Sequence, residues 1–387
     1  MYQRDKAELN DFLKIPAFIQ DIVRDYPFER LEQLLPPETV RRARRIVLTG
    51  NGDSYAASMA LRFFFQKMWN LTDVTAERAI DASRNLYLSP DEDSSQTLVF
   101  IISESGTGAR VAEVAERMHR KGCTVVGVTR GVNSNVAQNA SCLLLETGPR
   151  CWDFHYSSQN FTYTNAMTNL FLAALYGAVV RGVITREREQ ALRDELLRYT
   201  GSFAREFDRV DEQMYRLALE WADTIGYDFV GSGADIAAAY FGAAKGFEYS
   251  GSVNMYSDSE DWNHINFFMR DRAKLGTCVM LSKNSTGYSR TLETVKAMLK
   301  SGRRVLVVTE DQPDALPQGT VVCTLPDTAE TGFKPLMDYI PFTLLAFHIA
   351  RMRDLSFFVT ENGYGTGPLF AEPDMNYIKT SQRIYID

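Results

Sequence analysis

The sequence predicts an α/β fold that is built twice, as two doubly wound domains, each with a parallel sheet between layers of helices. Three observations lead to this prediction. Short apolar runs alternate with helical patterns along most of the 387 residues, which is typical of parallel sheets. Some of these runs, such as residues 98–102, are apolar throughout, as expected of strands buried on both faces. The same succession of elements then occurs a second time, which favours two domains.

Three landmarks of the first half recur in the second. They are a small polar turn after an apolar strand, a second loop of similar kind, and a glycine followed by another strand: residues 50–54, 103–108 and 122–129 match residues 231–235, 282–287 and 302–309. Counted from Gly50 and Gly231, the loops begin at offsets of 53 and 51, and the third landmarks at 72 and 71. Three matches at nearly equal offsets are hard to obtain by chance.

The order of elements gives the expected domain borders. After a helical lead-in over residues 1–40, the first half is expected to contain strands at 46–48, 74–76, 98–102, 125–128 and 141–146, and helices at 53–69, 108–121, 165–181 and 186–221. We place the first domain at 41–200, the second at 201–350, and a loop-rich tail at 351–387. A tail stays ordered only if something holds it, so we expect this one to pack back over the site.

Composition and charge exclude several classes of function. The formal charge of −7 argues against general affinity for nucleic acid. The N-terminus is too polar for a secretory signal, and the longest apolar stretch, residues 170–180, is too short to span a bilayer. Five scattered cysteines without a CxxC pair indicate reduced, cytoplasmic thiols and no zinc site. We therefore expect a cytoplasmic protein without a metal, a membrane segment or a nucleic-acid partner.

The turns at the strand ends form the first candidate site. Gly50 and Ser103 each follow a strand directly, and the carboxyl ends of parallel strands meet at one edge of a sheet, so both can line one pocket. Hydroxyl groups, glycine backbone and the start of a helix together suit a phosphate group. The candidate phosphate-binding residues are Ser54, Ser103, Ser105, Thr107 and Gly52, with Asn51 and Gly108 beside them. The alternative is that these residues merely cap helices.

The same loops differ from nucleotide-binding turns. No GxxxxGK[ST] motif occurs, and Tyr55 stands where a GxGxxG motif starting at Gly50 needs its third glycine. A nucleotide cofactor is therefore disfavoured, a lone phosphate fits better, and we expect no cofactor.

The second half carries different residues. Its loop at 282–287 lacks the Ser-x-Ser-Gly pattern of the first. Instead, Glu248 stands at a helix end between Phe247 and Tyr249, and His264 follows sixteen residues later. A carboxylate beside aromatic rings can have a raised pKa, which suits a general base, and a histidine can pass protons near neutral pH. Without further information, a glutamate at a helix end is inert in most proteins.

These motifs resemble the sugar isomerase (SIS) domain. The strand followed by Gly-Asn-Gly-Asp-Ser-Tyr, the strand followed by Ser-Glu-Ser-Gly-Thr-Gly, and the duplication are similar to the tandem SIS arrangement in the isomerase half of glucosamine-6-phosphate synthase and in bacterial fructosamine 6-phosphate deglycases. The resemblance covers the chain from about residue 30 onward. It implies a three-layer αβα, flavodoxin-like fold for both domains, and a sugar phosphate held by Ser54, Ser103 and Ser105.

Two further positions bear on the resemblance at the phosphate-binding loops. The family usually has a threonine two residues after the loop glycine, where this chain has Gly108, with Thr107 one residue early. Ser158 aligns with another ligand-binding serine of the family.

The resemblance also implies roles for three further residues. Glu248 corresponds to the base that moves a proton between sugar carbons, and His264 to the group that opens the sugar ring. The family's His-Gly-Pro is replaced by His264-Ile265-Asn266, so the local backbone must differ. Lys379 resembles a lysine just before the C-terminus that reaches the reactive end of the sugar, and the alternative is an exposed terminal lysine.

The implied function is a phosphosugar isomerase or deglycase. Its substrate would be an amino-sugar or fructosamine 6-phosphate, which reacts through an enediol or enaminol. We expect no glutaminase activity, because Tyr2 follows Met1 where a cysteine nucleophile would be needed. We expect a homodimer with a shared active site, because in the family the histidine comes from the neighbouring subunit. The alternative is a non-catalytic regulatory protein that binds a sugar phosphate and has no need of Glu248 and His264.

Overall fold

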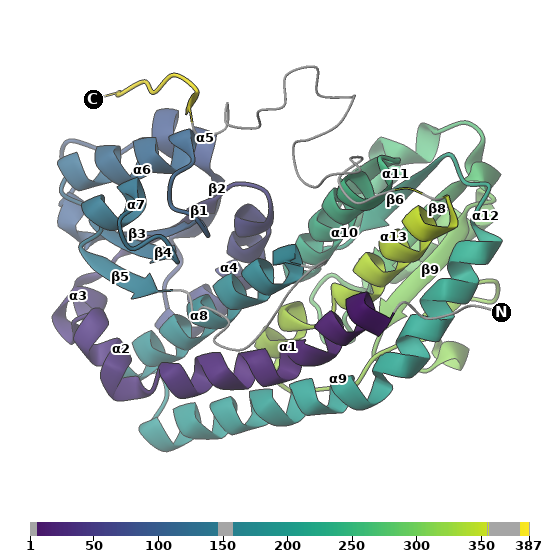
Figure 1. The fold of residues 1–387 in the computed structure, drawn as a ribbon, viewed down its shortest axis with the longest axis horizontal. Coiled ribbons are helices and arrows are strands. Elements are labelled where there is room, and N and C mark those ends of the chain that lie inside the picture. Colours follow the sequence, from purple (N-terminus) through teal and green to yellow (C-terminus); the bar gives the residue numbers. More distant parts are fainter. Residues whose placement is uncertain (1–5, 146–157, 354, 356–379, 387) are drawn as a thin grey trace. The chain divides into compact units, whose positions relative to one another are not determined.

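The computed structural model describes residues 6–145, 158–353, 355 and 380–386, which form two compact units (Figure 1). Unit 1 comprises Met1–Leu197 with Met375–Asp387, and unit 2 comprises Arg198–Asp374. The long helix α9 (Arg186–Glu220) crosses this boundary. The domain borders expected from the sequence, 41–200 and 201–350, stay a prediction.

Unit 1 contains a parallel five-stranded sheet in the order β2-β1-β3-β4-β5. Its strands are β1 (Arg45–Gly50), β2 (Val74–Arg78), β3 (Thr97–Ile102), β4 (Thr124–Thr129) and β5 (Cys142–Leu145). Its helices are α1 (Lys6–Asp25), α2 (Phe28–Leu34), α3 (Pro37–Arg42), α4 (Asp53–Trp69), α5 (Ala79–Arg84), α6 (Ala109–Arg120), α7 (Asn135–Asn139) and α8 (Ser158–Val180). The strand predicted at 46–48 is longer, and the predicted helix at 53–69 has the expected bounds.

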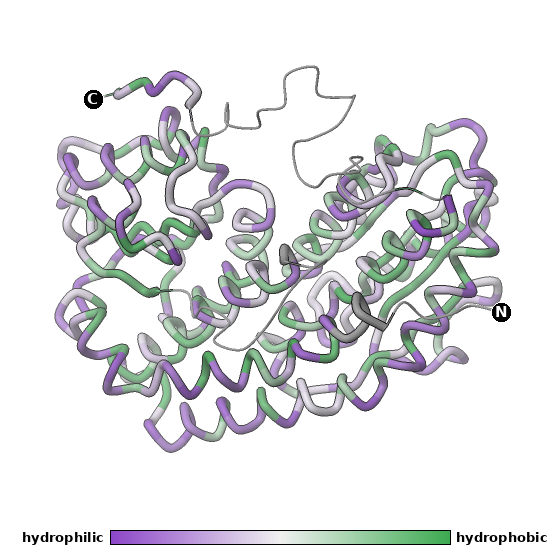
Figure 2. The backbone as a smooth tube through the Cα atoms, in the orientation of Figure 1, coloured by the Kyte–Doolittle hydropathy of each residue, from purple (hydrophilic) through white to green (hydrophobic). Residues whose placement is uncertain are grey.

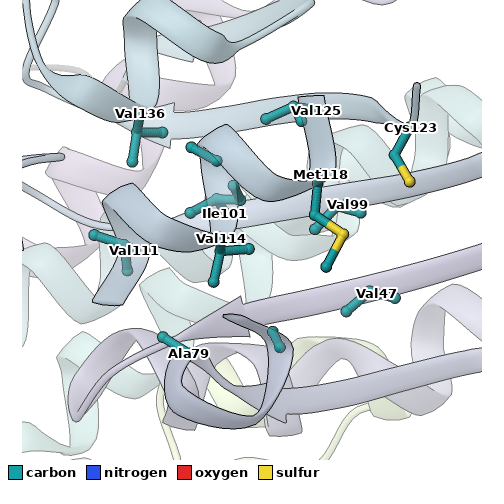
Figure 3. Packing of buried hydrophobic residues seen from close by; sticks show 12 residues of the cluster. Val47, Ala79, Val99, Ile101, Val111, Val114, Met118, Cys123, Val125 and Val136 are labelled. Atoms are coloured by element: carbon teal, nitrogen blue, oxygen red, sulfur yellow. The ribbon is translucent and has the colours of Figure 1, made fainter. Parts of the chain in front are cut away.

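Helices cover both faces of this sheet. On one face, Val111 and Met118 of α6 pack with Val99 and Val125 of the strands (Figure 3). On the other, the ring of Phe65 in α4 meets that of Phe100 in β3 with centroids 5.3 Å apart. All of the β3 side chains are buried, as the apolar run predicted.

Unit 2 repeats this topology, with a parallel sheet in the order β10-β9-β8-β6-β7. Its strands are β6 (Gly226–Val230), β7 (Val253–Ser257), β8 (Leu275–Met280), β9 (Arg304–Thr309) and β10 (Val321–Thr324). Its helices besides α9 are α10 (Ile236–Ser250), α11 (Ser259–His264), α12 (Tyr288–Lys300) and α13 (Ile340–Met352). Strand β6 therefore takes the place of β1, and β8 that of β3, so the predicted fold class and its duplication are confirmed.

The two faces of the second sheet are also covered. Trp262 of α11 and Val295 of α12 pack with Val230 and Val279 on one face. On the opposite face, Phe229 of β6 meets Phe342 of α13 with ring centroids 5.4 Å apart. In Figure 2, α13 is largely hydrophobic, whereas α9 carries many hydrophilic residues.

The cysteines that the structure describes are packing residues. Cys123, Cys142, Cys278 and Cys323 are buried and free. Burial raises the pKa of the Cys123 and Cys142 thiols to about 11, so few of them are in the reactive thiolate form. Cys151 lies outside the described residues.

No helix within the described ranges is long and apolar enough to cross a membrane.

Candidate active site

The first loop of unit 1 connects β1 to α4. Gly50 ends β1, and a Cβ atom there would lie 2.5 Å from the Cβ of Ser54 and 2.9 Å from the carbonyl oxygen of Ile102. Gly52 has a φ of 52°, which glycine adopts without strain. These two glycines allow the chain to turn tightly into α4, whose first turn carries Ser54. Asn51 and Gly52 are exposed, and Ser54 is partly exposed.

The second loop of unit 1 lies beside the first. Strands β1 and β3 are parallel neighbours, with Thr49 next to Ile101, so Gly50 and Ser103 lie at the same sheet edge. The Oγ of Ser103 accepts a hydrogen bond from the Gly106 N–H at 3.1 Å. The hydroxyl oxygens of Ser105 and Thr107 are 3.0 Å apart. The loop therefore presents several hydroxyl groups at one end of the sheet.

Gly106 is the bend of this loop. Its φ is 64°, and a Cβ atom there would lie 2.1 Å from the Oγ of Ser134, the N-cap residue of α7. Gly108 is the N-cap residue of α6, so the free N–H groups of that helix start directly after the loop. Hydroxyl groups and a helix N-terminus at one place can hold an anion.

Two arginines that the sequence analysis did not single out flank these loops. Arg78 ends β2 beside Gly50, and its guanidinium lies 4.7 Å from the ring centroid of Tyr55. Arg130 follows β4, and its guanidinium is 3.5 Å from the carboxylate of Glu104. A carboxylate facing a phosphate would repel it, but the Glu104 carboxylate is paired with a cation at the same sheet edge.

The matching loop of unit 2 is filled by its own carboxylates. Asp235 stands where unit 1 has Ser54, and it accepts hydrogen bonds from the Oγ of Ser282 at 2.6 Å and from its N–H at 3.1 Å. Glu310 stands where unit 1 has Arg130, and its carboxylate accepts from the Lys283 N–H at 2.7 Å. Burial raises the pKa of Asp235 to about 6. In unit 2, carboxylates therefore occupy the Ser282 hydroxyl and the N–H groups of Ser282 and Lys283, whereas a serine and an arginine stand at the carboxylate positions in unit 1.

Glu248 lies in the last turn of α10. Its Oε2 is 2.6 Å from the Nζ of Lys245, one helical turn earlier. The Lys245 side chain is fully buried, whereas that of Glu248 is 29% exposed. Of the aromatic neighbours named from the sequence, Tyr249 is buried and Phe247 is half exposed. The sequence analysis missed Lys245, although its i, i+3 spacing to Glu248 on a helix was a usable signal.

His264 is the last residue of α11 and is 71% exposed. Its Nε2 lies 3.1 Å from the Oε1 of Glu260, whose carboxylate also accepts from the guanidinium of Arg290. Ile265 and Phe268, which follow it, are 65% and 73% exposed. His264 and Glu248 thus have separate hydrogen-bond partners within unit 2.

The remaining predicted residues are placed less fully. Ser158 is the first residue of α8. Lys379 lies outside the described residues. The segment that follows it, 380–386, contacts α6 and α7: the Ile384 N–H donates to Glu113 at 2.6 Å, and Arg110 donates to the Ser381 hydroxyl at 3.2 Å. This part of the tail therefore binds the helix that begins at the hydroxyl-rich loop.

Comparison with known proteins finds a family match in the first half of the chain and curated relatives along most of it. Residues 39–175 match the SIS domain family. The chain is 22% identical over 355 residues to a glutamine–fructose-6-phosphate aminotransferase (isomerizing) of Clostridium tetani, covering 89% of this chain and 56% of that protein. The mouse glutamine–fructose-6-phosphate aminotransferase (isomerizing) 2 is 25% identical over 323 residues, covering 81% of this chain and 44% of that protein. The chain thus spans about half the length of these curated relatives.

Solved structures show which proteins share this fold. The C-terminal domain of glucosamine-fructose-6-phosphate aminotransferase from Francisella tularensis superposes with a TM-score of 0.79 at 16% identity, covering 92% of this chain and 99% of that one. Tagatose-6-phosphate ketose/aldose isomerase from Escherichia coli gives a TM-score of 0.69 at 15% identity, with coverages of 91% and 94%. The chain therefore contains a SIS domain and has the fold of phosphosugar isomerases. More particularly, it is homologous to the isomerase part of glutamine–fructose-6-phosphate aminotransferase.

Proposed function

We propose that this chain is an isomerase or deglycase of a hexose 6-phosphate, either an amino sugar or a fructosamine. The observation that carries the proposal is the contrast between the two loops. The loop of unit 1 presents the hydroxyls of Ser105 and Thr107, whereas Asp235 occupies the matching loop of unit 2. The loop of unit 1 is therefore suited to binding a phosphate, and we assign the proton transfer by Glu248 to unit 2.

In the proposed reaction, the phosphate is held by Ser54, Ser103, Ser105 and Thr107 at the start of α6. The Glu248 carboxylate takes the proton next to the carbonyl or imine carbon, and an enediol or enaminol results. His264 helps to open the ring, and Lys379 stabilises the developing oxyanion. Returning the proton to the neighbouring carbon yields the isomer. For a fructosamine this isomer is an imine at C1, and water hydrolyses it to the free amine and the aldose phosphate, which are the deglycase products. Lys245 fits this scheme as the cation that holds Glu248 in place, since a buried ammonium needs a counter-ion.

The proposal includes a homodimer in which His264 acts in the neighbouring subunit. The exposure of His264 and of the apolar residues Ile265 and Phe268 supports it. Exposed apolar side chains gathered beside a candidate catalytic residue are typical of a surface that a partner covers.

The test is hydrogen exchange between the sugar carbons C1 and C2 and heavy water. Hexose 6-phosphates and fructosamine 6-phosphates are screened by NMR, and exchange identifies the substrate. Glu248→Gln should lower the exchange rate about 10²- to 10⁴-fold, the usual contribution of a general base. Glu212→Gln, an exposed carboxylate on α9 paired with Arg216, is the control. A Glu248→Gln protein within about tenfold of the parent, below that range, would refute the role of Glu248.

The alternative function is a sugar-phosphate-binding regulatory protein that uses the same loop without catalysis. Such a protein would bind the phosphorylated sugars and exchange none of their carbon-bound protons. Product analysis of the substrate identified in the screen then separates an isomerase, which gives one product, from a deglycase, which gives two.

A further inference from the structure

Asp228 is a buried carboxylate in the interior of an apolar strand. Asp228 lies in the middle of β6 and is 0% exposed. Aspartate is depleted in strands, and a buried carboxylate is costly unless hydrogen bonds compensate for lost hydration. Burial raises the pKa of this carboxyl to about 6. A residue that breaks a local rule in this way is expected to have a compensating role.

Both carboxylate oxygens of Asp228 are bonded to residues that flank His264. The Trp262 Nε1–H donates to Oδ2 at 2.7 Å, and the Asn266 Nδ2–H donates to Oδ1 at 2.9 Å. Trp262 stands two residues before His264, and Asn266 two residues after it. The segment that carries the histidine is thus attached to the central sheet on both sides of that residue.

Further contacts hold the same segment. The Arg303 guanidinium donates to the Asn266 carbonyl at 2.8 Å and lies 5.6 Å from the ring centroid of Trp262. The Asn263 amide donates to Thr294 of α12 at 2.8 Å. The anchoring residues are buried or partly buried, whereas the His264 side chain between them is exposed. The backbone on both sides of His264 is therefore held in place, and the imidazole projects from it into solvent.

We infer that Asp228 is a positioning residue for His264: its carboxylate fixes the segment 262–266 from beneath and so sets where the imidazole lies. This inference rests on the proposed function for the role of His264. It also accounts for the departure from the family's His-Gly-Pro, because Asn266 stands at the proline position and supplies the amide that Asp228 binds.

The first test separates ring opening from proton abstraction. In fructose 6-phosphate the C2–O5 bond must break, with a proton moving to O5 and the anomeric hydroxyl losing one. The 5-deoxy analogue lacks O5, and its O6 carries the phosphate, so it stays open. We expect His264→Gln to lower C1-proton exchange of fructose 6-phosphate while sparing the analogue, and Glu248→Gln to lower both.

Asp228→Asn and Asn266→Ala should repeat the selective pattern of His264→Gln. The ratio of the two exchange rates should fall by about tenfold, up to about 100-fold, because small misplacements of a catalytic group have effects of that size. Asp223→Asn removes a carboxylate from an exposed pair with Arg304 and should leave the ratio unchanged. Asn266→Ala keeps the experiment decisive if Asp228→Asn does not fold.

The second test is independent of activity. The chain has four histidines, so the His264 ring resonances can be assigned by their loss in His264→Gln. In Asp228→Asn and Asn266→Ala these resonances should shift or broaden, while those of His348 stay in place. Folded variants with unchanged His264 resonances and an unchanged rate ratio would overturn the inference. Wild-type protein that exchanges neither these two sugars nor any amino-sugar or fructosamine 6-phosphate would instead contradict the proposed function, and the NMR result would still decide the positioning role.

Discussion

Lys245 and Glu248 form an ion pair of unequal exposure. The ammonium is fully buried, whereas the carboxylate is partly open to solvent and can meet a ligand. Removing one partner of a buried ion pair leaves the other uncompensated, which costs about 3–5 kcal/mol. Glu248→Gln is therefore the appropriate test of chemistry, because glutamine keeps an oxygen that can accept from Lys245.

The buried carboxyl of Asp228 should make stability depend on pH. Its pKa is about 6 in the folded protein and 3.8 as the reference value, so the folded state binds the proton more tightly. This contribution to stability is fully present below the reference value and is lost as pH rises through 6. The groups that face Asp228 and modulate its charge are Arg303, which lowers its pKa, and Cys278, whose pKa it helps to raise.

The expected measurement is the free energy of unfolding of wild type and Asp228→Asn between pH 4 and pH 8. The difference, wild type minus variant, should fall by on the order of 3 kcal/mol across this range, since one pKa unit corresponds to about 1.4 kcal/mol. Asp223→Asn, at an exposed ion pair, should show no such trend. A difference that is constant with pH would mean that Asp228 titrates at the same pH in both states.

At the scale of elements, two similar loops differ in what occupies their donors. We expect Ser105→Ala to weaken binding of a hexose 6-phosphate by about tenfold to 100-fold, the effect of losing a hydrogen bond to a charged group. Ser285→Ala, in the loop that Asp235 fills, is the control and should bind as wild type does. Titration calorimetry measures both, and equal weakening by the two substitutions would contradict the division of roles.

Helix α6 joins the hydroxyl-rich loop to the C-terminal tail. Glu113 of this helix is buried, pairs with Arg84 and Arg110, and accepts the N–H of Ile384. Glu113→Gln should loosen residues 381–386, because the neutral side chain binds the N–H and both arginines more weakly. Hydrogen exchange of the tail amides should speed up about tenfold or more, an effect of about 1.4 kcal/mol.

Glu116 of the same helix provides the matched control for the tail. Glu116→Gln removes a similar charge from α6 without touching the contacts of Ile384, and the tail should exchange as in wild type. Unchanged exchange in Glu113→Gln as well would show that other contacts hold the tail, such as Arg383 with Asn135.

At the scale of the whole molecule, the proposed dimer predicts complementation. On a substrate whose ring must open, Glu248→Gln and His264→Gln proteins should each be nearly inactive. If His264 acts in the neighbouring subunit, a mixed dimer contains one intact site, and an equal mixture should recover about a quarter of wild-type activity. Sedimentation should show dimers, and native mass spectrometry should show that mixed species form. Mixed dimers without recovered activity would place both residues in the same subunit.

The fold was predictable because its signals are local. The continuous apolar run at 98–102 marked β3 as a buried strand, and the repeated spacing of turns indicated two copies of one topology. The start of α4 at Asp53 was predictable for the same reason, since it follows directly from a glycine turn. The candidate site was predictable where motif and sheet edge coincide, as at Ser54 and Ser103.

The chain by itself thus determined the duplicated α/β fold and the position of a hydroxyl-rich loop at one sheet edge. Only the tertiary structure decided which polar side chains form hydrogen bonds with one another. Asp235 bonds Ser282 across 47 positions and Asp228 bonds Asn266 across 38, so sequence spacing gave no sign of either contact. Periodicity records which face of an element is buried, whereas a hydrogen bond between distant elements depends on strand order and on how the chain returns to the sheet.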